Sequence, residues 1–261
     1  MDIRSKMLEA LGLAQETIID DPKALLKCLF LVGGPGSGKS FVVKQLAGLV
    51  VPVPKIIDSD KLFTKKLDVV GLPQKIPPKN DPDPVRQALR DKQMKIRDTA
   101  MVGINKVLQS QLNGYFSVII DGTGKNADKM AARKATMEKL GYDCFCLVVN
   151  TSLPTAQTRN ADRTRSLPAT GPESVEEIWH LVQANVPFFK KLFGDKILIV
   201  NNDPERLDVA LVRDVMTKFF SGVTQNPVGQ ALLANKDKGS ITRQVGPDDI
   251  GKFESQTRLP Q

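Results

Sequence analysis

The chain has 261 residues, of which 41% are hydrophobic and 25% are charged, a composition typical of a globular protein with a sizeable core. No apolar run approaches the roughly 20 residues of a membrane-spanning helix. The charged first residues are unlike a signal peptide, so we expect a cytoplasmic protein, in the host cytoplasm if a phage encodes it. Three cysteines in apolar runs (Cys28, Cys144 and Cys146) and a single His180 exclude a disulfide framework and a chemistry centred on histidine.

A phosphate-binding loop is the first clear signal along the chain. Residues 1–26 are expected to form a helix and a turn, and the apolar run 28–32 that follows is typical of a buried strand. The sequence GGPGSGKS comes next and opens into a helical pattern over 41–47, which is the strand–loop–helix context that this motif requires. We therefore predict that ATP is bound by Gly33, Gly34, Pro35, Gly36, Ser37, Gly38, Lys39 and Ser40.

Each residue type in this loop has a physical reason. Glycines allow successive main-chain N–H groups to surround a polyphosphate. Lys39 would reach the β- and γ-phosphates, and the Ser40 hydroxyl would be a ligand of Mg²⁺.

Two carboxylates follow the second predicted strand, 55–57. Ligands of doubly wound sheets collect beyond the carboxyl ends of the strands, where Asp58 and Asp60 are expected to lie. A carboxylate at this place can accept the proton of an attacking hydroxyl, so we predict a catalytic role for Asp60 and substrate contacts for both. A turn or a helix N-cap is the competing interpretation, since aspartate favours both.

A basic segment follows. Residues 64–84 are rich in proline and lysine and are predicted to be an irregular, exposed insert, after which Asp83 and Pro84 begin a long helix that ends at Gly114. Between Lys61 and Arg97, ten lysines and arginines stand against four aspartates, a net charge of +6. Such a run is usually a solvated helix face, but beside a phosphate site it favours nucleic acid or a phosphorylated metabolite. We expect Arg86 and Arg90 to contact this substrate.

The third predicted strand, 115–120, runs into Asp121, Gly122 and Thr123. We predict that Asp121 helps to bind Mg²⁺ and that Thr123 touches the acceptor, with an Asx turn as the alternative. A helix over 126–140 and a fourth strand over 144–149 follow.

An arginine-bearing stretch over 155–172 is predicted to be a lid. Arg159 and Arg163 are four residues apart, so a helix would place them on one face, where they could close over the triphosphate. A solvated basic helix is the alternative. A helix over 172–193, a fifth strand over 196–200 and a helix over 204–219 complete the pattern, and Asn201 and Asn202 are candidates for base contacts.

Strands that are apolar on both faces alternate with helices, which predicts an α/β protein with a five-stranded, mainly parallel sheet and helices on both faces. With the phosphate loop, this is a P-loop NTPase fold. We expect one domain over 1–220, which includes the insert over 64–84 and the lid over 155–172, and a flexible tail over 221–261.

The segments GGPGSGKS, IIDSD, VIIDGT, GYDCFCLVV and TRNADRTRSLP, in this order, resemble the zeta-toxin and phage polynucleotide-kinase group of P-loop kinases, over residues 26–220. The resemblance implies that Asp60 is the general base, that Arg159 and Arg163 are the lid arginines, and that Lys39 and Ser40 keep their loop roles. The DGT segment lacks the first aspartate of the D-x-D-G-T phosphatase motif that phage polynucleotide kinases often carry. The basic insert also departs from that pattern.

The first hypothesis is therefore an ATP- and Mg²⁺-dependent kinase of nucleic acid, acting on a 5′-hydroxyl end or on a 5-hydroxymethyluracil base in phage DNA. A zeta-toxin-like kinase of a nucleotide sugar or another small phosphorylated metabolite is the second hypothesis. An ATPase or nucleotide switch without an acceptor is the third. The sequence does not indicate an oligomeric state.

Overall fold

The computed structural model describes residues 25–46, 53–78, 81–163, 166–168, 170–171, 173–236, 244–246 and 249. Most of the helix and turn predicted over 1–26, and the end of the tail predicted over 221–261, therefore lie outside the described residues. A membrane-spanning helix is absent from the part of the chain that the structure describes.

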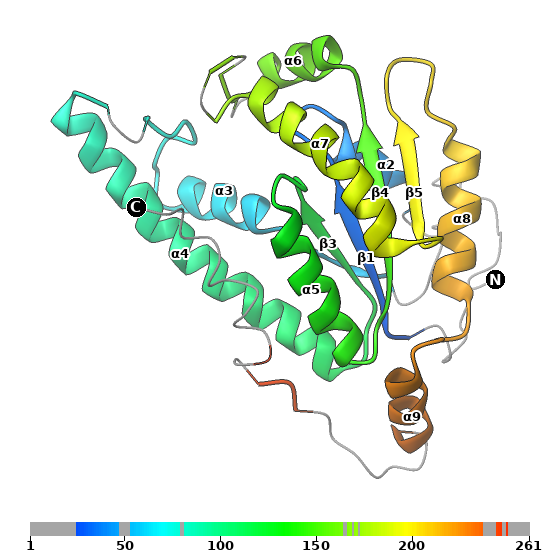
Figure 1. The fold of residues 1–261 in the computed structure, drawn as a ribbon. Coiled ribbons are helices and arrows are strands. Elements are labelled where there is room, and N and C mark those ends of the chain that lie inside the picture. The colour runs from blue at the N-terminus through cyan, green and yellow to red at the C-terminus, as the bar shows by residue number, and fades with distance from the viewer. Residues whose placement is uncertain are drawn as a thin grey trace, which may run out of the picture.

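Five strands form one parallel sheet in the order β2-β3-β1-β4-β5 (Figure 1), which confirms the predicted fold class. They are β1 Lys27–Val32, β2 Lys55–Ile57, β3 Val118–Gly122, β4 Asp143–Asn150 and β5 Ile197–Asn201. All six residues of the central strand β1 are buried, as expected for a strand covered on both faces. Val32 at its end pairs with Gly122 and Val148, so the carboxyl ends of β1, β3 and β4 meet at one edge of the sheet.

Helices cover both faces of this sheet. Their bounds are α2 Lys39–Gln45, α3 Ser59–Val69, α4 Pro84–Asn113, α5 Ala127–Lys139, α6 Leu153–Ala161, α7 Val175–Phe193, α8 Val209–Ser221 and α9 Pro227–Lys236. Cys28 and Phe30 of β1 join a core with α4, α5 and α7, while Leu29 and Leu31, pointing the other way, join a core with α2 and α8. All three cysteines are free and buried, as predicted from their apolar surroundings.

Three predicted boundaries were wrong. Strand β3 begins at Val118 because Tyr115 takes φ = +63° just after α4, and the N–H groups of Tyr115 and Phe116 close that helix end on earlier carbonyls. Helix α7 begins at Val175, capped by Ser174. Helix α8 begins at Val209, where the Asp208 carboxylate accepts a hydrogen bond from Leu211 N, and residues 204–206 form a turn.

The predicted basic insert is more regular than expected. Residues 64–69 belong to α3, which packs on α4 through Phe63, Leu67 and Ala100. The chain after α3 also contacts α4. The buried side-chain amide of Gln93 in α4 donates hydrogen bonds to the carbonyls of Pro73 (2.6 Å) and Lys75 (3.1 Å). The irregular, exposed loop predicted over 64–84 is therefore wrong for residues 64–69, whereas residues 70–78 and 81–83 are irregular as expected. We call α3, residues 70–78 and 81–83, and the first half of α4 the arm.

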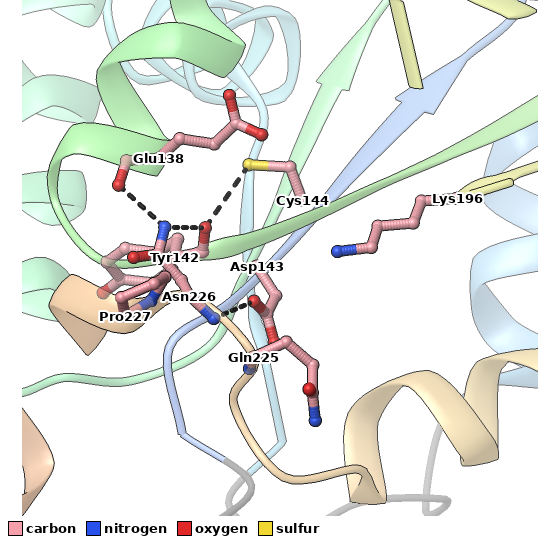
Figure 2. A pocket seen from close by; sticks show the side chains of 8 residues that line it. All are labelled: Glu138, Tyr142, Asp143, Cys144, Lys196, Gln225, Asn226 and Pro227. Atoms are coloured by element: carbon pink, nitrogen blue, oxygen red, sulfur yellow. Dashed lines mark hydrogen bonds between the residues drawn. The ribbon is translucent and has the colours of Figure 1, made fainter. Parts of the chain in front are cut away.

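The first part of the predicted tail packs on the amino ends of the strands, far from the phosphate loop. The Thr224 hydroxyl donates to Leu25 O (2.6 Å), and the backbone N–H groups of Gln225 and Asn226 both donate to Asp143 (2.8 Å each). Asp143, Gln225 and Asn226 also line a small pocket, whose volume is about 220 Å³. Figure 2 shows these three residues around it. The pocket lies at the edge of the sheet opposite the loop, and the Asp143 carboxylate is bonded to the chain itself. We therefore interpret these hydrogen bonds as a structural anchor for α9.

Asp143 also forms a buried ion pair with Lys27, at 2.7 Å, with side chains 5% and 3% exposed. We expect Asp143→Ala to lower the free energy of unfolding by about 3–5 kcal/mol, because it leaves a buried, uncompensated ammonium group. Urea titration measures the change. The control is Asp214→Ala, which breaks an exposed pair with Lys218 and should cost less than about 1 kcal/mol. Equal losses in the two variants would contradict this interpretation.

Candidate active site

The loop of residues 33–40 joins β1 to α2, and it brings Lys39 to the edge where β3 ends. The Lys39 ammonium group donates a hydrogen bond to Gly33 O at 2.6 Å. It lies 3.8 Å from Asp121 Oδ1, so the structure brings together these two predicted site residues. An ammonium group and a carboxylate side by side at the end of a loop have the chemistry to bind a phosphate group and a cation.

Two loop glycines are required because neighbouring elements approach the backbone very closely. A Cβ on Gly36, which has φ = +76°, would lie 2.1 Å from Ala156 O in α6. A Cβ on Gly38, which has φ = +85°, would lie 2.0 Å from the side-chain nitrogen of Asn202. The loop is therefore held between α6 and the chain that follows β5, and these positions accept no larger side chain without a shift.

Three buried polar atoms at this site have no hydrogen-bond partner among the described residues. They are Ser37 Oγ, Asp121 Oδ1 and Arg159 Nη1. Buried polar groups are normally paired, because an unpaired one costs about 1–3 kcal/mol. The guanidinium donor suits a phosphate oxygen, and the carboxylate acceptor suits a cation that accompanies a polyphosphate.

The residues present fit Mg²⁺ in the way that triphosphate sites use it. Within the described residues, no group of three or more His, Cys, Asp or Glu side chains could hold a metal ion alone. Mg²⁺ needs no such group, since it commonly keeps one or two protein ligands and takes the rest from phosphates and water. Asp121, with Ser40 at the start of α2, could supply these ligands.

The carboxyl group of Asp121 has a raised pKa, as groups in active sites often do. Its burial raises its pKa to about 6, the nearby Lys39 ammonium opposes the rise, and the charges of Asp58 and Asp60 add to it. Three aspartates from β3 and the start of α3 are thus close enough to interact. Like charges at this range are unfavourable unless positive charge, such as the Lys39 ammonium, offsets them.

This pKa gives a pH prediction for the protein in EDTA without nucleotide. Because the folded pKa of Asp121 lies above the ordinary value of 3.8, its contribution to the free energy of unfolding falls as the pH rises from about 4 to about 6. Asp121→Asn removes this loss. The free energy of unfolding of the variant, relative to that of the wild type, should therefore be higher at pH 8 than at pH 4 by up to about 3 kcal/mol. Urea titration at both pH values measures the gain. A constant difference would show that Asp121 titrates normally, and Asp128→Asn, at an exposed carboxyl of α5, is the control.

Asp58 and Asp60 lie at the turn from β2 into α3. Asp58 is the N-cap of α3, and its side chain accepts a hydrogen bond from Lys61 N at 2.9 Å. The N-cap alternative is therefore confirmed for Asp58. Asp60 lies in the first helical turn and is exposed, so its carboxylate is accessible to a substrate. Its catalytic role stays a prediction.

The predicted lid contains one arginine at the loop and one away from it. Arg159 lies in the last turn of α6, and its Nη1 is 3.5 Å from the place of a Cβ on Gly38. Arg163 lies beyond the end of α6 and is exposed. The prediction that both share one helix face was wrong, because Asp162 already caps the helix.

Other predicted substrate residues have partners within the chain. Arg86 Nη2 lies 3.1 Å from Asp81 Oδ2, and Arg90 donates to the carbonyl of Pro77, so both hold the arm together. The Thr123 hydroxyl follows β3 and accepts a long hydrogen bond from Lys125 N at 3.5 Å. Substrate contacts of these residues remain predictions.

The sequence also led us to miss contacts around the loop. Asn202 was predicted to contact the base, but its side chain is buried and donates to Ser37 O at 2.7 Å. Its neighbour Asp203 was not predicted at all. It accepts hydrogen bonds from Thr151 and Ser152, and these keep the pKa of its carboxyl well below the ordinary value. The only local signal was a run of polar residues directly after a strand.

Comparisons with known proteins support the fold. A family profile described as "AAA domain" matches residues 29–184, which is more than half of the chain. The structure of a candidate kinase from Chloroflexus aurantiacus is 17% identical with a TM-score of 0.50, and the match covers 76% of this chain and 99% of that one. No curated protein sequence matches the chain.

Two further solved structures are similar at lower scores. One comes from the PezAT chromosomal toxin–antitoxin system of Streptococcus pneumoniae, with 14% identity, a TM-score of 0.48, and coverage of 90% of this chain and 93% of that chain. The other is a shikimate kinase from Acinetobacter baumannii in complex with shikimate, with 18% identity, a TM-score of 0.39, and coverage of 81% and 95%. At these scores, neither match supports a conclusion about this chain.

Proposed function

Since the chain belongs to the AAA domain family, we propose that it is an ATP-dependent kinase that transfers the γ-phosphoryl group to a hydroxyl of a nucleic acid. A P-loop kinase domain is the class that the family and the fold define, and the acceptor is the open question. One observation carries the proposal: Asp121 and Arg159 lie beside Lys39 and Gly38 of the loop, and both keep a buried polar atom that has no hydrogen-bond partner among the described residues.

The chain's own residues would divide the work as follows. The Lys39 ammonium would leave Gly33 O for the phosphate oxygens, and the Arg159 guanidinium would neutralise charge that develops during transfer. Asp60, exposed at the start of α3, would take the proton of the attacking hydroxyl. Asp121 and Ser40 would hold Mg²⁺, which would supply positive charge to offset that of the phosphates.

The acceptor is inferred from the charge of the arm. Lysines 61, 65, 75, 92 and 95 and Arg97 are all exposed on α3, on α4 or between them. Lys61 directly follows Asp60 in the chain, and the other cations lie farther along the arm, in which α3 packs along α4 (Figure 1). A cationic surface that begins at the proposed base favours an acceptor that carries several phosphates, such as a 5′-hydroxyl DNA end or DNA with a 5-hydroxymethyluracil base.

A second candidate, a kinase of a nucleotide sugar or another small phosphorylated metabolite, is favoured by a different observation. Arg86 and Arg90 are bonded within the arm, which leaves less fixed positive charge for a long polyanion. A small acceptor needs only one or two phosphate contacts, and the remaining lysines could supply these.

The experiment that tests the proposal uses γ-labelled ATP with three acceptors: a 5′-hydroxyl oligonucleotide, DNA containing 5-hydroxymethyluracil, and a nucleotide sugar. We expect label on one of the DNA acceptors. Raising the salt from 50 to 200 mM should weaken the apparent affinity for a single strand about 50-fold if four phosphates are contacted. Label on the nucleotide sugar alone would support the second candidate, and label only in free phosphate would identify an ATPase.

A further inference from the structure

The connection after β5 places two adjacent polar side chains against two different parts of the site. The Asn202 side chain is 5% exposed and donates to Ser37 O of the phosphate loop at 2.7 Å. Its backbone N–H continues the sheet by donating to Asn150 O at 2.8 Å. Asn202 is therefore fixed by the sheet and in turn fixes the loop just before Gly38 and Lys39.

Asp203, the next residue, holds the start of α6 instead. One oxygen of its carboxylate accepts from the Thr151 hydroxyl (2.6 Å), from Ser152 N (2.9 Å) and from the Ser152 hydroxyl (3.0 Å). Ser152 is the N-cap of α6, so these bonds set where that helix begins. An ionised acceptor makes such bonds about twice as strong as neutral ones.

Helix α6 and the phosphate loop touch each other as well. The carbonyl oxygen of Ala156 in α6 packs against Gly36 of the loop. Arg159 Nη1 lies beside Gly38 and has no hydrogen-bond partner among the described residues. Whether Arg159 faces the loop thus depends on where α6 begins and on where the loop lies. Asp203 fixes the start of α6, and its neighbour Asn202 fixes the loop.

We propose that Asn202 and Asp203 are positioning residues that hold the phosphate loop and α6 in register, so that Arg159 faces the bound phosphates. The proposal rests on the proposed function, since it assumes that Arg159 binds the nucleotide. Neither side chain needs to touch the substrate. Asn202 acts on the loop itself, and Asp203 acts through α6 and therefore through Arg159.

The single tryptophan of the chain lies at this junction and can report on it. Trp179 Nε1 in α7 donates to Thr151 O at 2.8 Å, and the Thr151 hydroxyl is bonded to Asp203. A change in how Asp203 holds Thr151 should change the surroundings of the indole. Intrinsic fluorescence of the protein can be assigned to this one residue.

The test measures the dissociation constant of a non-hydrolysable ATP analogue with Mg²⁺ by calorimetry. We expect Asn202→Ala and Asp203→Ala each to weaken binding about five- to tenfold, as expected for the loss of a buried hydrogen bond. In an Arg159→Ala background, Asp203→Ala should cost less than about twofold, since residues acting through one another are not additive. Asp203→Asn, which keeps an acceptor oxygen, should lie between the wild type and alanine.

Asp208→Ala is the matched control, because it removes the N-cap of α8 in the same connection without touching the loop or α6. It should leave nucleotide affinity and Trp179 emission unchanged, whereas Asp203→Ala should shift the emission. The inference would be overturned if Asp203→Ala weakened analogue binding by the same factor in the wild-type and Arg159→Ala proteins, or if Asn202→Ala bound the analogue like the wild type. The proposed function would stand in either case. Failure of the wild type to bind the analogue would overturn both.

Discussion

Lys39→Ala is expected to reduce phosphoryl transfer by about 10²- to 10³-fold, the cost of removing one preorganised charge from a transfer site. The ammonium group is held at Gly33 O, 2.6 Å away, and beside Asp121, so it is already placed at the end of the loop. Loss of this charge should weaken nucleotide binding and slow the chemical step together. Steady-state rates with γ-labelled ATP and the best acceptor measure both effects.

Lys44→Ala is the control for this prediction. Lys44 lies in the last turn of the same helix, α2, and it is exposed. Its replacement also removes one positive charge and leaves the loop untouched, so the rate should stay close to that of the wild type. A similar loss in the two variants would mean that general charge, and not the position of Lys39, accounts for the effect.

Asp60→Asn is expected to reduce acceptor phosphorylation by about 10²- to 10⁴-fold, the usual contribution of a general base. Nucleotide affinity should change little, because Asp60 is exposed at the start of α3 and binds no phosphate in the proposed mechanism. Parallel measurements of transfer rate and of analogue binding separate the two properties.

Two neighbouring carboxylates sharpen this test. Asp68→Asn changes an exposed aspartate of the same helix, which is bonded to Gln74, and should have no effect on transfer. Asp58→Asn keeps an N-cap residue at the start of α3, so the helix should remain intact. If transfer survives in Asp60→Asn but is lost in Asp58→Asn, the base has been assigned to the wrong residue.

The parts of the fold that the sequence predicted are those fixed by local pattern. A parallel strand covered on both faces needs an unbroken apolar run, and residues 28–32 and 144–149 have one. The loop from Gly33 to Ser40 was equally clear, since its glycines, lysine and serine have fixed spacing between a strand and a helix.

The parts that the sequence did not predict depend on contacts between distant residues. The segment after α3 has several prolines and no periodicity, yet the amide of Gln93 satisfies its carbonyls from the next helix. Gly114 does end α4, as expected, but the left-handed conformation that follows the helix is taken by Tyr115 and not by the glycine. Asn202 bonds to a loop residue 165 positions earlier, and no local rule indicates such a partner.

Charge in a sequence is likewise silent about which side chains are free. Arg86 and Arg90 belong to the most basic segment of the chain, but each is bonded within the arm. Arg159 and Arg163 have helical spacing, but α6 ends between them. The structure places the Arg159 guanidinium beside the loop, with a donor that has no hydrogen-bond partner among the described residues, and its role there stays a prediction.

The central claim is that a phosphoryl group moves from ATP to an alcohol. The most direct measurement is the destination of the label from γ-labelled ATP, followed over time for the wild type and for Asp60→Asn. The account predicts one labelled acceptor for each ADP formed by the wild type and almost none for the variant. Label that appears only as inorganic phosphate, at the same rate in both proteins and with or without an acceptor, would contradict it.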